Sequence, residues 1–436
     1  MQTERNTTPD GPAPPPGWLE QVKAGARSRA EELPFPTGKE ERWRFTDLSL
    51  LRPDGYALRT GPRSRSARLP EEAARWLADD GPVAGRIVHV DGVLAELELG
   101  ADARRMGVVL ADLEEAAALH AELLAPRLGR LVTPDDHFSA RALAHADDGV
   151  FLHVPAGVAI EGQVQLGSWL GAASAGLARY PRAVVVVGEG ASVTFSELFG
   201  STDLPAGAAP TLVAPTVELY IGAGARVGWS TWQELGRGQR YFANLAAHLE
   251  RDAELEAVLV SLGASYSRSE QRVVLAGEGA RSVMLGAYYP AGSQKVEHWT
   301  VQDHRAPNTT SDLLHVGVLA DEARSVYYGT IRIAEGARRS DAYQANRNLV
   351  LSAAAKADTN PQLEIANNDV RCTHGATVGP LDREAMFYLM SRGIPRPGAE
   401  RLVVQGFFGK LLGRMKRTGL APRLAEAVRR KAGAPS

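Results

Sequence analysis

The chain has one cysteine, Cys372, among its 436 residues. A lone thiol excludes a disulfide framework and a zinc site made of CxxC pairs, and it suits a reducing cytoplasm. The chain also has no run of eighteen apolar residues, so we expect no membrane span. Residues 1–17 are polar and rich in proline, with no apolar core, which predicts a disordered tail rather than a signal peptide.

Neither sign of charge is in excess. The chain has 49 lysines and arginines against 51 aspartates and glutamates, a formal net charge of −2. This balance argues against nucleic acid as the main partner. Hydrophobic residues make up 44% and charged residues 23% of the chain, which is typical of soluble globular proteins. A chain of this length can bury a large core, and we expect two or three domains.

Nucleotide-binding and catalytic motifs are missing as well. No Gly-x-Gly turn extends to a full GxGxxG between a strand and a helix. Residues 406–410 resemble the tail of a Walker A loop, but Leu411 stands where that loop needs serine or threonine. Neither a GxSxG elbow nor an HExxH pair occurs. We therefore expect a non-catalytic chain without an ATP site.

Residues 18–130 predict a mixed, largely helical N-terminal region. The segments 70–80 and 110–130 are rich in Ala, Leu, Glu and Arg, which favours helices. Between them, residues 86–93 predict a strand that enters a turn. Residues 40–48 form a compact motif of aromatic and charged side chains.

Residues 131–376 predict a β-solenoid. Short Val, Leu and Thr runs alternate there with turns of the form Gly-x-Gly-Ala or close variants. Four alanines that end these turns are 34, 28 and 27 residues apart, namely Ala191, Ala225, Ala253 and Ala280. A strand–turn unit repeated at this period indicates stacked rungs rather than a sandwich. We therefore predict a mainly β fold with a β-helix core, whose ends the flanking helical regions could cover.

Residues 377–436 predict a helical C-terminal domain, because helical periodicity returns after Pro380. The last 27 residues carry eight lysines and arginines against one acid, Glu426. Such a segment could bind phosphates or an acidic partner surface. A solvated helix face near a flexible end has the same composition.

Cys372 and His374 are the candidate metal ligands. Residues i and i+2 of a strand point to one face, so both donors would aim the same way. Thiolate and imidazole are ligands of iron, zinc and Fe–S clusters. One Cys and one His cannot fill a coordination sphere, so further ligands would come from elsewhere, for instance from another chain. The alternative is a cysteine that packs as a small hydrophobe and a histidine in a hydrogen bond.

Two further clusters allow other interpretations. Three histidines gather in one segment, where β-core or surface histidines with satisfied hydrogen bonds are favoured over metal binding. Adjacent acids could serve as acid and base in a carbohydrate-cleaving β-helix, but neighbours in a strand point to opposite faces. The histidines are His298, His304 and His315, and the acid pairs are Asp135–Asp136 and Asp147–Asp148.

Four ordered strings closely resemble the SufB/SufD family of Fe–S cluster assembly scaffolds. They are residues 302–313 (QDHRAPNTTSDL), 324–331 (RSVYYGTI), 341–351 (DAYQANRNLVL) and 361–379 (PQLEIANNDVRCTHGATVG). Residues 387–394 (FYLMSRGI) extend the match, and 41–46 (ERWRFT) are similar to the N-terminal region of the SufD branch. That branch fits better than SufB, because residues 373–376 are Thr-His-Gly-Ala where SufB-like chains carry Glu-His-Glu-Ala. A cysteine that SufB-like chains carry is also missing from residues 343–346.

The resemblance implies a right-handed parallel β-helix and a scaffold role in an ATP-driven SufBCD complex that passes Fe–S clusters to apo-proteins. It implies pairing with a SufB-like paralogue through the β-helix, and binding of a SufC-like ATPase by the C-terminal helices. His374 is implied as an Fe or cluster ligand at the partner interface, with Cys372 as the neighbouring family cysteine. A transient cluster or iron, and a reduced flavin for the complex, are the implied cofactors. A homodimer and a purely structural scaffold remain alternatives.

Overall fold

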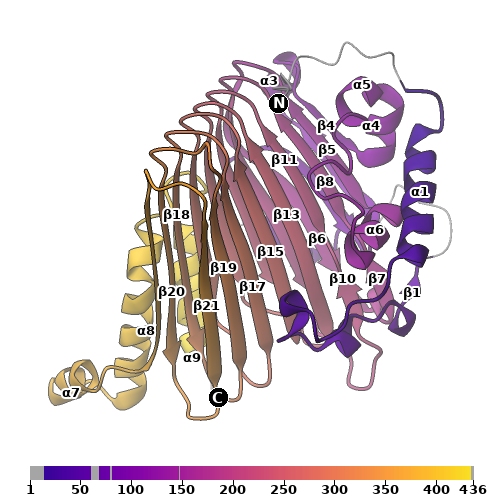
Figure 1. Cartoon of the computed structure of the whole chain (residues 1–436). Coiled ribbons are helices and arrows are strands. Elements are labelled where there is room, and N and C mark those ends of the chain that lie inside the picture. The colour runs from indigo at the N-terminus through magenta and orange to yellow at the C-terminus, as the bar shows by residue number, and fades with distance from the viewer. Residues whose placement is uncertain (1–13, 60–67, 79–80, 147, 434–436) are drawn as a thin grey trace.

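The fold comes from a computed structural model that describes residues 14–59, 68–78, 81–146 and 148–433. Most of the tail predicted for residues 1–17 therefore lies outside the described residues. Figure 1 shows a long stack of strands with helices beside its N-terminal and C-terminal parts. The predicted mainly β solenoid is confirmed.

Two sheets face each other, and from residue 216 onward successive strands of the chain alternate between them. From the first turn to the last, sheet A contains β4 (Val109–Asp112), β5 (Gly149–Val154), β8 (Arg182–Val187), β11 (Thr216–Ile221), β13 (Gln239–Leu249), β15 (Tyr266–Leu275), β17 (Lys295–His304), β19 (Arg324–Ile333) and β21 (Lys356–Ile365). Sheet B contains β3 (Val93–Leu99), β2 (Val83–Val90), β6 (Ala159–Leu170), β9 (Ser192–Ser201), β12 (Arg226–Glu234), β14 (Glu254–Ser261), β16 (Arg281–Tyr288), β18 (Thr310–Leu319), β20 (Asp341–Val350) and β22 (Arg371–Pro380). Strands of successive turns pair in parallel, so each turn adds one strand to each sheet. Among the described strands, only the outermost pairs, β2 with β3 and β4 with β5, are antiparallel. The short strands β1 (Ala57–Leu58), β7 (Leu177–Arg179) and β10 (Thr211–Val213) pair at the side of sheet A.

The repeated turns explain the spacing of the alanines. Each of the four is fully buried, and its N–H donates to the carbonyl three residues earlier. In the turn that ends at Ala280, Gly279 has a φ of +75°, which glycine adopts without strain. A Cβ on Gly277 would lie 1.9 Å from the backbone nitrogen of Arg251 in the preceding turn. Close stacking of the turns therefore requires glycine at Gly277.

The lumen between the sheets is apolar in the early turns and more polar in the later ones. Phe195, Trp229 and Ala257 lie in register on successive strands and belong to one large core. In the later turns His298, His304 and His315 are buried. Burial lowers the pKa of His304 to about 4 and that of His315 to about 3, so both are neutral near pH 7. The favoured interpretation as satisfied β-core residues agrees with His298 and His304, which hydrogen-bond to serine or threonine hydroxyls. It is wrong for His315, because neither of its ring nitrogens has a hydrogen-bond partner among the described residues.

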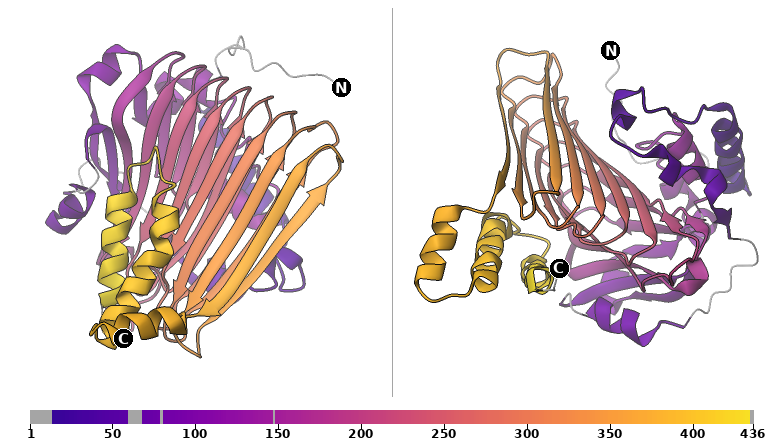
Figure 2. Two further views of the ribbon diagram at one scale, coloured as in Figure 1. Left: turned by 90° about the vertical axis from the view of Figure 1, so that its left-hand side faces the viewer. Right: turned by 90° about the horizontal axis from the view of Figure 1, so that it is seen from below.

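Helices cover the outer faces of both sheets. On sheet A, helices of the N-terminal region pack over β5 and β8. These helices are α1 (Trp18–Glu32), α4 (Leu113–Leu119), α5 (Ala121–Leu124) and α6 (His137–Ala144), while α2 (Glu71–Leu77) and α3 (Ala101–Arg105) lie nearer sheet B and the first turn. On sheet B, α8 (Arg396–Leu412) and α9 (Ala421–Gly433) pack on the later strands, and α7 (Arg383–Ser391) projects away from them (Figure 2).

The expectation that helical regions cover both ends of the solenoid is wrong for the last turn. At the first turn, Ala103 and Val108 do join the lumen core. At the last turn, β21 and β22 are the final strands of their sheets, and no described strand pairs beyond them. The C-terminal helices lie on the face of sheet B because its outward residues Leu285, Leu314 and Val316 match their apolar sides.

The predicted segment boundaries differ from the positions of the strands. Strands β2, β3 and β4 come before residue 131, and α6 lies inside the range 131–376. The last strand ends at Pro380, beyond residue 376. The division into separate domains at these boundaries stays a prediction.

Glu197 of β9 makes the stability of the fold depend on pH. Its side chain is 7% exposed and accepts a hydrogen bond from Thr231 at 3.0 Å, and burial raises its pKa from 4.5 to about 7. The folded state then binds the proton more tightly than the unfolded state, so stability falls as the pH rises from 4.5 to 7. We expect the free energy of unfolding, measured with urea, to fall by up to about 3 kcal/mol over this pH range. Glu197→Gln should remove this decline. An identical pH profile in the two proteins would contradict the assignment.

Candidate functional site

Cys372 and His374 lie on β22, the edge strand of sheet B in the last turn. Cys372 pairs in register with Ala342, and His374 pairs with Gln344. Ala342 and Gln344 are both buried, so the two candidate ligands point to the lumen side of the sheet, as their spacing predicts. No described strand lies beyond β22, so this side of the last turn is open.

Cys372 is half-buried and packs against Ile333, Ala337 and Ala342. Burial raises the pKa of its thiol, and the carboxylate of Asp341 raises it further. The protonated thiol is therefore favoured near neutral pH, and a thiol must lose its proton to bind a metal. Cys372 is the less available of the two donors.

His374 is exposed and makes no hydrogen bond or ion pair with the described residues. Its imidazole is therefore open to a ligand or to a partner chain. Among the described residues, no group of three or more His, Cys, Asp or Glu side chains could hold a metal ion. The structure thus brings Cys372 and His374 to one open face without completing a site around them.

Apolar side chains surround the open end. Leu363 is 37% exposed, Ile365 44% and Val378 46%, and they lie on β21 and β22. Figure 2 shows these last strands at one end of the stack, with the helices to the side of it. An end with two unpaired strand edges and exposed apolar side chains is a template for pairing with another sheet. Sequence reasoning missed these residues, since nothing local marks a strand as the last one.

A second exposed apolar patch lies on the C-terminal helices. Phe387 of α7 is 75% exposed, and its neighbours Tyr388 and Met390 and Leu402 of α8 are also exposed. Buried side chains of α8, such as Phe408 and Leu411, face the solenoid instead. The packing of α8 on sheet B therefore leaves this patch exposed.

Three of the eight basic residues near the C-terminus fasten the helices to sheet B by ion pairs. Arg414 pairs with Asp312 of β18, and Arg417 pairs with Glu254 of β14. Arg430 pairs with Glu234 of β12. These pairs give the basic segment a structural use that its composition did not reveal. Residues 406–410 lie within α8, so they form no phosphate-binding loop.

Asp136 and Asp148, from the two pairs of adjacent acids, form contacts that stabilise the fold. Asp136 caps α6 by accepting from the N–H groups of Phe138 and Ser139, both at 2.9 Å. Asp148 is buried in an ion pair with Arg179. Asp147 lies outside the described residues. Neither pair therefore offers two free carboxyl groups to a sugar.

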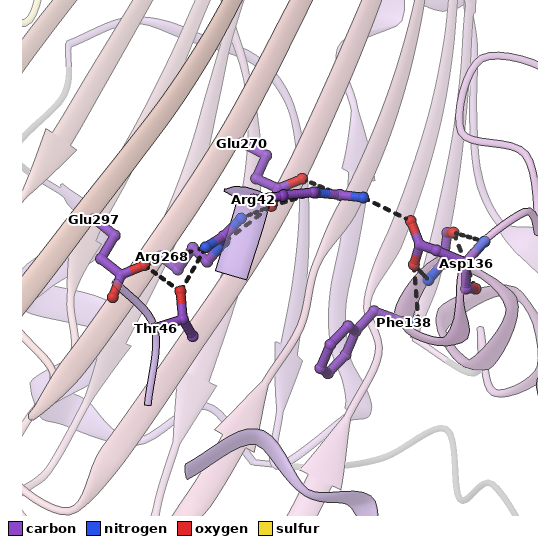
Figure 3. Close-up of polar contacts among 8 residues, drawn as sticks. Arg42, Thr46, Asp136, Phe138, Arg268, Glu270 and Glu297 are labelled. Atoms are coloured by element: carbon purple, nitrogen blue, oxygen red, sulfur yellow. Dashed lines mark hydrogen bonds and ion pairs between the residues drawn. The ribbon is translucent and has the colours of Figure 1, made fainter. Parts of the chain in front are cut away.

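The aromatic and charged N-terminal motif docks on the outer face of sheet A. Figure 3 shows Arg268 of β15 between Thr46 and Glu297 on one side and Glu270 on the other. The guanidinium of Arg268 donates to Glu297 at 3.2 Å and to Thr46 Oγ1 at 2.6 Å. It also lies 4.3 Å from the ring centre of Trp43 and 4.6 Å from that of Trp299. Arg268 itself is fully buried.

Arg42 extends this network to α6. Its guanidinium contacts Glu270 and lies 3.0 Å from Asp136. Burial alone would raise the pKa of Glu270, but the charges of Arg42 and Arg268 outweigh it and lower that pKa to about 2. The motif 41–46 is thus a clamp between the N-terminal region and β15.

A groove of about 620 Å³ lies beside this clamp on sheet A. Its lining carries five carboxylates against the two guanidiniums of Arg42 and Arg272. The ring of Trp299 is already in contact with other side chains. It stacks on Tyr328 with 4.1 Å between the ring centres, and the guanidinium of Arg268 also lies over it. A flavin needs a free surface for its ring and positive charge for its phosphates. The groove does not fit a flavin.

Comparison with known proteins identifies the family. Residues 170–407 match the SUF system FeS cluster assembly, SufBD core domain, and residues 15–166 match the SufBD protein N-terminal region. The iron-sulfur cluster assembly protein SufD of Bacillus subtilis is 29% identical over 95% of this chain and 94% of its own length. A SufBD family protein of Mycobacterium tuberculosis is 27% identical over 95% of both chains. SufB of Bacillus subtilis is 26% identical over 90% of this chain and 84% of its own length.

No helix in the described part of the chain is both long enough and apolar enough to span a membrane. The matched core domain covers more than half of the chain and contains the solenoid turns from β9 to β22. The chain therefore belongs to the SufBD family of iron–sulfur cluster assembly proteins.

Proposed function

We propose that this chain is a SufD-like scaffold subunit that pairs with a SufB-like paralogue through the open end of its solenoid. The unpaired edges of β21 and β22 support this proposal, together with the exposed Leu363, Ile365 and Val378. A second solenoid with a similar open end would continue both sheets and bury these side chains. A homodimer would use the same surface, so it would compete with the paralogue.

His374 supplies a ligand for iron or a nascent cluster at that interface, and the partner supplies the thiolates. The observation that carries this role is an exposed imidazole on the open lumen side of the last turn, which has no hydrogen-bond or ion-pair partner in the described part of the chain. Histidine replaces cysteine on one iron of Rieske centres, so a cluster with mixed ligands is chemically sound. Cys372 has a smaller part, because its thiol is half-buried and its pKa is raised.

The C-terminal helices bind a SufC-like ATPase. Phe387 and Tyr388 form an exposed aromatic surface on a helix that stands away from the solenoid. Aromatic residues are enriched at protein interfaces. The ATPase would hydrolyse ATP, and movement of α7 and α8 would carry the change to the solenoid. The expected location is the cytoplasm.

The test is anaerobic co-expression with the SufB-like and SufC-like proteins of the same genome, followed by purification and native mass spectrometry. We expect a complex with one copy of this chain, one SufB-like chain and two ATPase subunits. In that complex His374→Ala should lower the cluster yield at least about tenfold, because loss of a residue that only supports a metal ligand already has an effect of about that size. Cluster content would be read from iron, sulfide and the absorption spectrum.

Thr373→Ala is the matched control, because Thr373 is an exposed neighbour that points to the opposite face of β22. It should leave the cluster yield unchanged. Normal yield in the intact His374→Ala complex would leave a purely structural scaffold as the function. A chain that purifies without either partner would remove the assembly role itself.

A further inference from the structure

The groove on sheet A has a floor made of one continuous row of side chains. Five residues lie in register across five strands of sheet A, from Ala246 on β13 through Arg272, Val301 and Thr330 to Gln362 on β21. Neighbouring strands lie about 4.8 Å apart, so the row is about 19 Å long. This length matches about six residues of extended polypeptide. The volume of about 620 Å³ lies within the usual range of binding sites.

The groove is closed at one end and open at the other. At the early turns, Glu218 of β11 accepts from the backbone N–H groups of Leu131 and Val132 and holds that loop over the sheet. The ion pair of Arg42 with Asp136 joins the loop to the N-terminal clamp. At the other end the floor reaches β21, the edge strand of the last turn. The groove therefore leads to the open end of the solenoid.

The charge of the lining selects a cationic occupant. Glu270 and Glu364 are paired with arginines, but Glu41 and Asp135 have no ion-pair partner among the described residues. Glu41 lies toward the open end, where it accepts from the hydroxyl of Tyr328 at 2.6 Å. Asp135 belongs to the loop at the closed end. Two exposed carboxylates thus lie toward opposite ends of the floor, and they disfavour phosphates and acidic peptides.

We infer that this groove binds an extended segment, carrying lysine or arginine, of the chain that pairs with the open end. The inference rests on the proposed function, because that partner would bring its own polypeptide next to β21. The segment would run along the floor from β21 toward β13. Its basic side chains would meet Glu41 and Asp135, and its apolar side chains would contact Val301 and the edge of Trp299.

Cross-linking in the assembled complex tests where the segment lies. A photoreactive amino acid at Thr330, the fourth of the five floor residues and next to the open end, should cross-link to a lysine- or arginine-bearing segment of the SufB-like partner, and mass spectrometry would identify it. The same photoreactive residue at Glu189, an exposed turn position in an early turn, serves as the control. A groove filled by a small cation from solution would give no cross-link to the partner.

Affinity for the purified SufB-like chain gives the second measurement. The double variant Glu41→Gln and Asp135→Asn keeps the shape of the groove, and we expect roughly tenfold weaker binding at low ionic strength. The difference should shrink in high salt, because exposed charges are screened. Glu189→Gln should bind as the unmodified chain does.

The two proposals can fail separately. Full affinity of the double variant, together with no partner cross-link at Thr330, would overturn the groove inference while the pairing at the open end stands. If the chain never pairs with the SufB-like protein, both proposals fall. Weaker, salt-dependent binding together with a cross-link to a basic segment supports the inference.

Discussion

Replacing Leu363 and Val378 with aspartate should abolish pairing with the SufB-like chain. These side chains are 37% and 46% exposed on the last turn, so the variant should fold like the unmodified protein. In the complex they would be buried, and two carboxylates would then lose water without gaining partners. We expect affinity to fall at least about a hundredfold, since each uncompensated buried charge costs several kcal/mol. Size-exclusion chromatography and a binding titration would measure the effect.

Leu97→Asp is the control for this result. Leu97 has the same exposed fraction of 37%, but it lies on β3 at the opposite end of sheet B. The control variant should pair normally. Equal loss of binding in both variants would indicate a general effect of added charge, and normal binding of the Leu363 and Val378 variant would place the interface elsewhere on the chain.

Replacing Arg268 with methionine should destabilise the protein by about 3–5 kcal/mol, the cost of breaking a buried ion pair. Arg268 is fully buried and its guanidinium faces Glu270 and Glu297. Without it, Lys295 at 3.1 Å is the one cation that Glu297 keeps among the described residues, and the rings of Trp43 and Trp299 lose the charge between them. Urea unfolding would measure the loss, and faster proteolysis near residues 39–44 would show that the clamp has opened.

A second substitution separates charge from packing in this experiment. Adding Glu297→Gln to Arg268→Met removes the buried carboxylate that has lost one of its two cations, so part of the lost stability should return. The pH dependence gives an independent check. The low pKa of Glu270 stabilises the fold above about pH 4.5, and this contribution is lost as the pH falls toward 2. Stability should therefore fall less steeply with falling pH in Arg268→Met. If Arg268→Met lowers the free energy of unfolding by less than about 1 kcal/mol, the role of the clamp is contradicted.

The sequence revealed the solenoid because its signals are local. The turn alanines recur at a near-regular period, and each is buried at the same point of a stacked turn. The shared face of Cys372 and His374 also follows from local geometry, because alternation along a strand needs no knowledge of the rest of the fold. These predictions depended on residues a few positions apart.

The residues that sequence reasoning missed act over long separations. Arg268 meets Thr46 across 222 residues, and Arg417 meets Glu254 across 163. The expectation that helices cover the last turn failed for the same reason, because the apolar side of α8 matches the face of sheet B rather than its end. Composition shows that a helix is amphipathic, but it does not show which distant surface will receive it.

The sequence by itself determined the repeating turns, the mainly β class and the position of Cys372 and His374 on one face of a strand. The tertiary structure decided that this strand is the last of its sheet, that His374 is exposed while Cys372 is half-buried, and that a groove leads to the same end. The physical reason is that turns and strand alternation are set by neighbouring residues. Which edges and faces remain uncovered is set by packing between residues far apart in the chain.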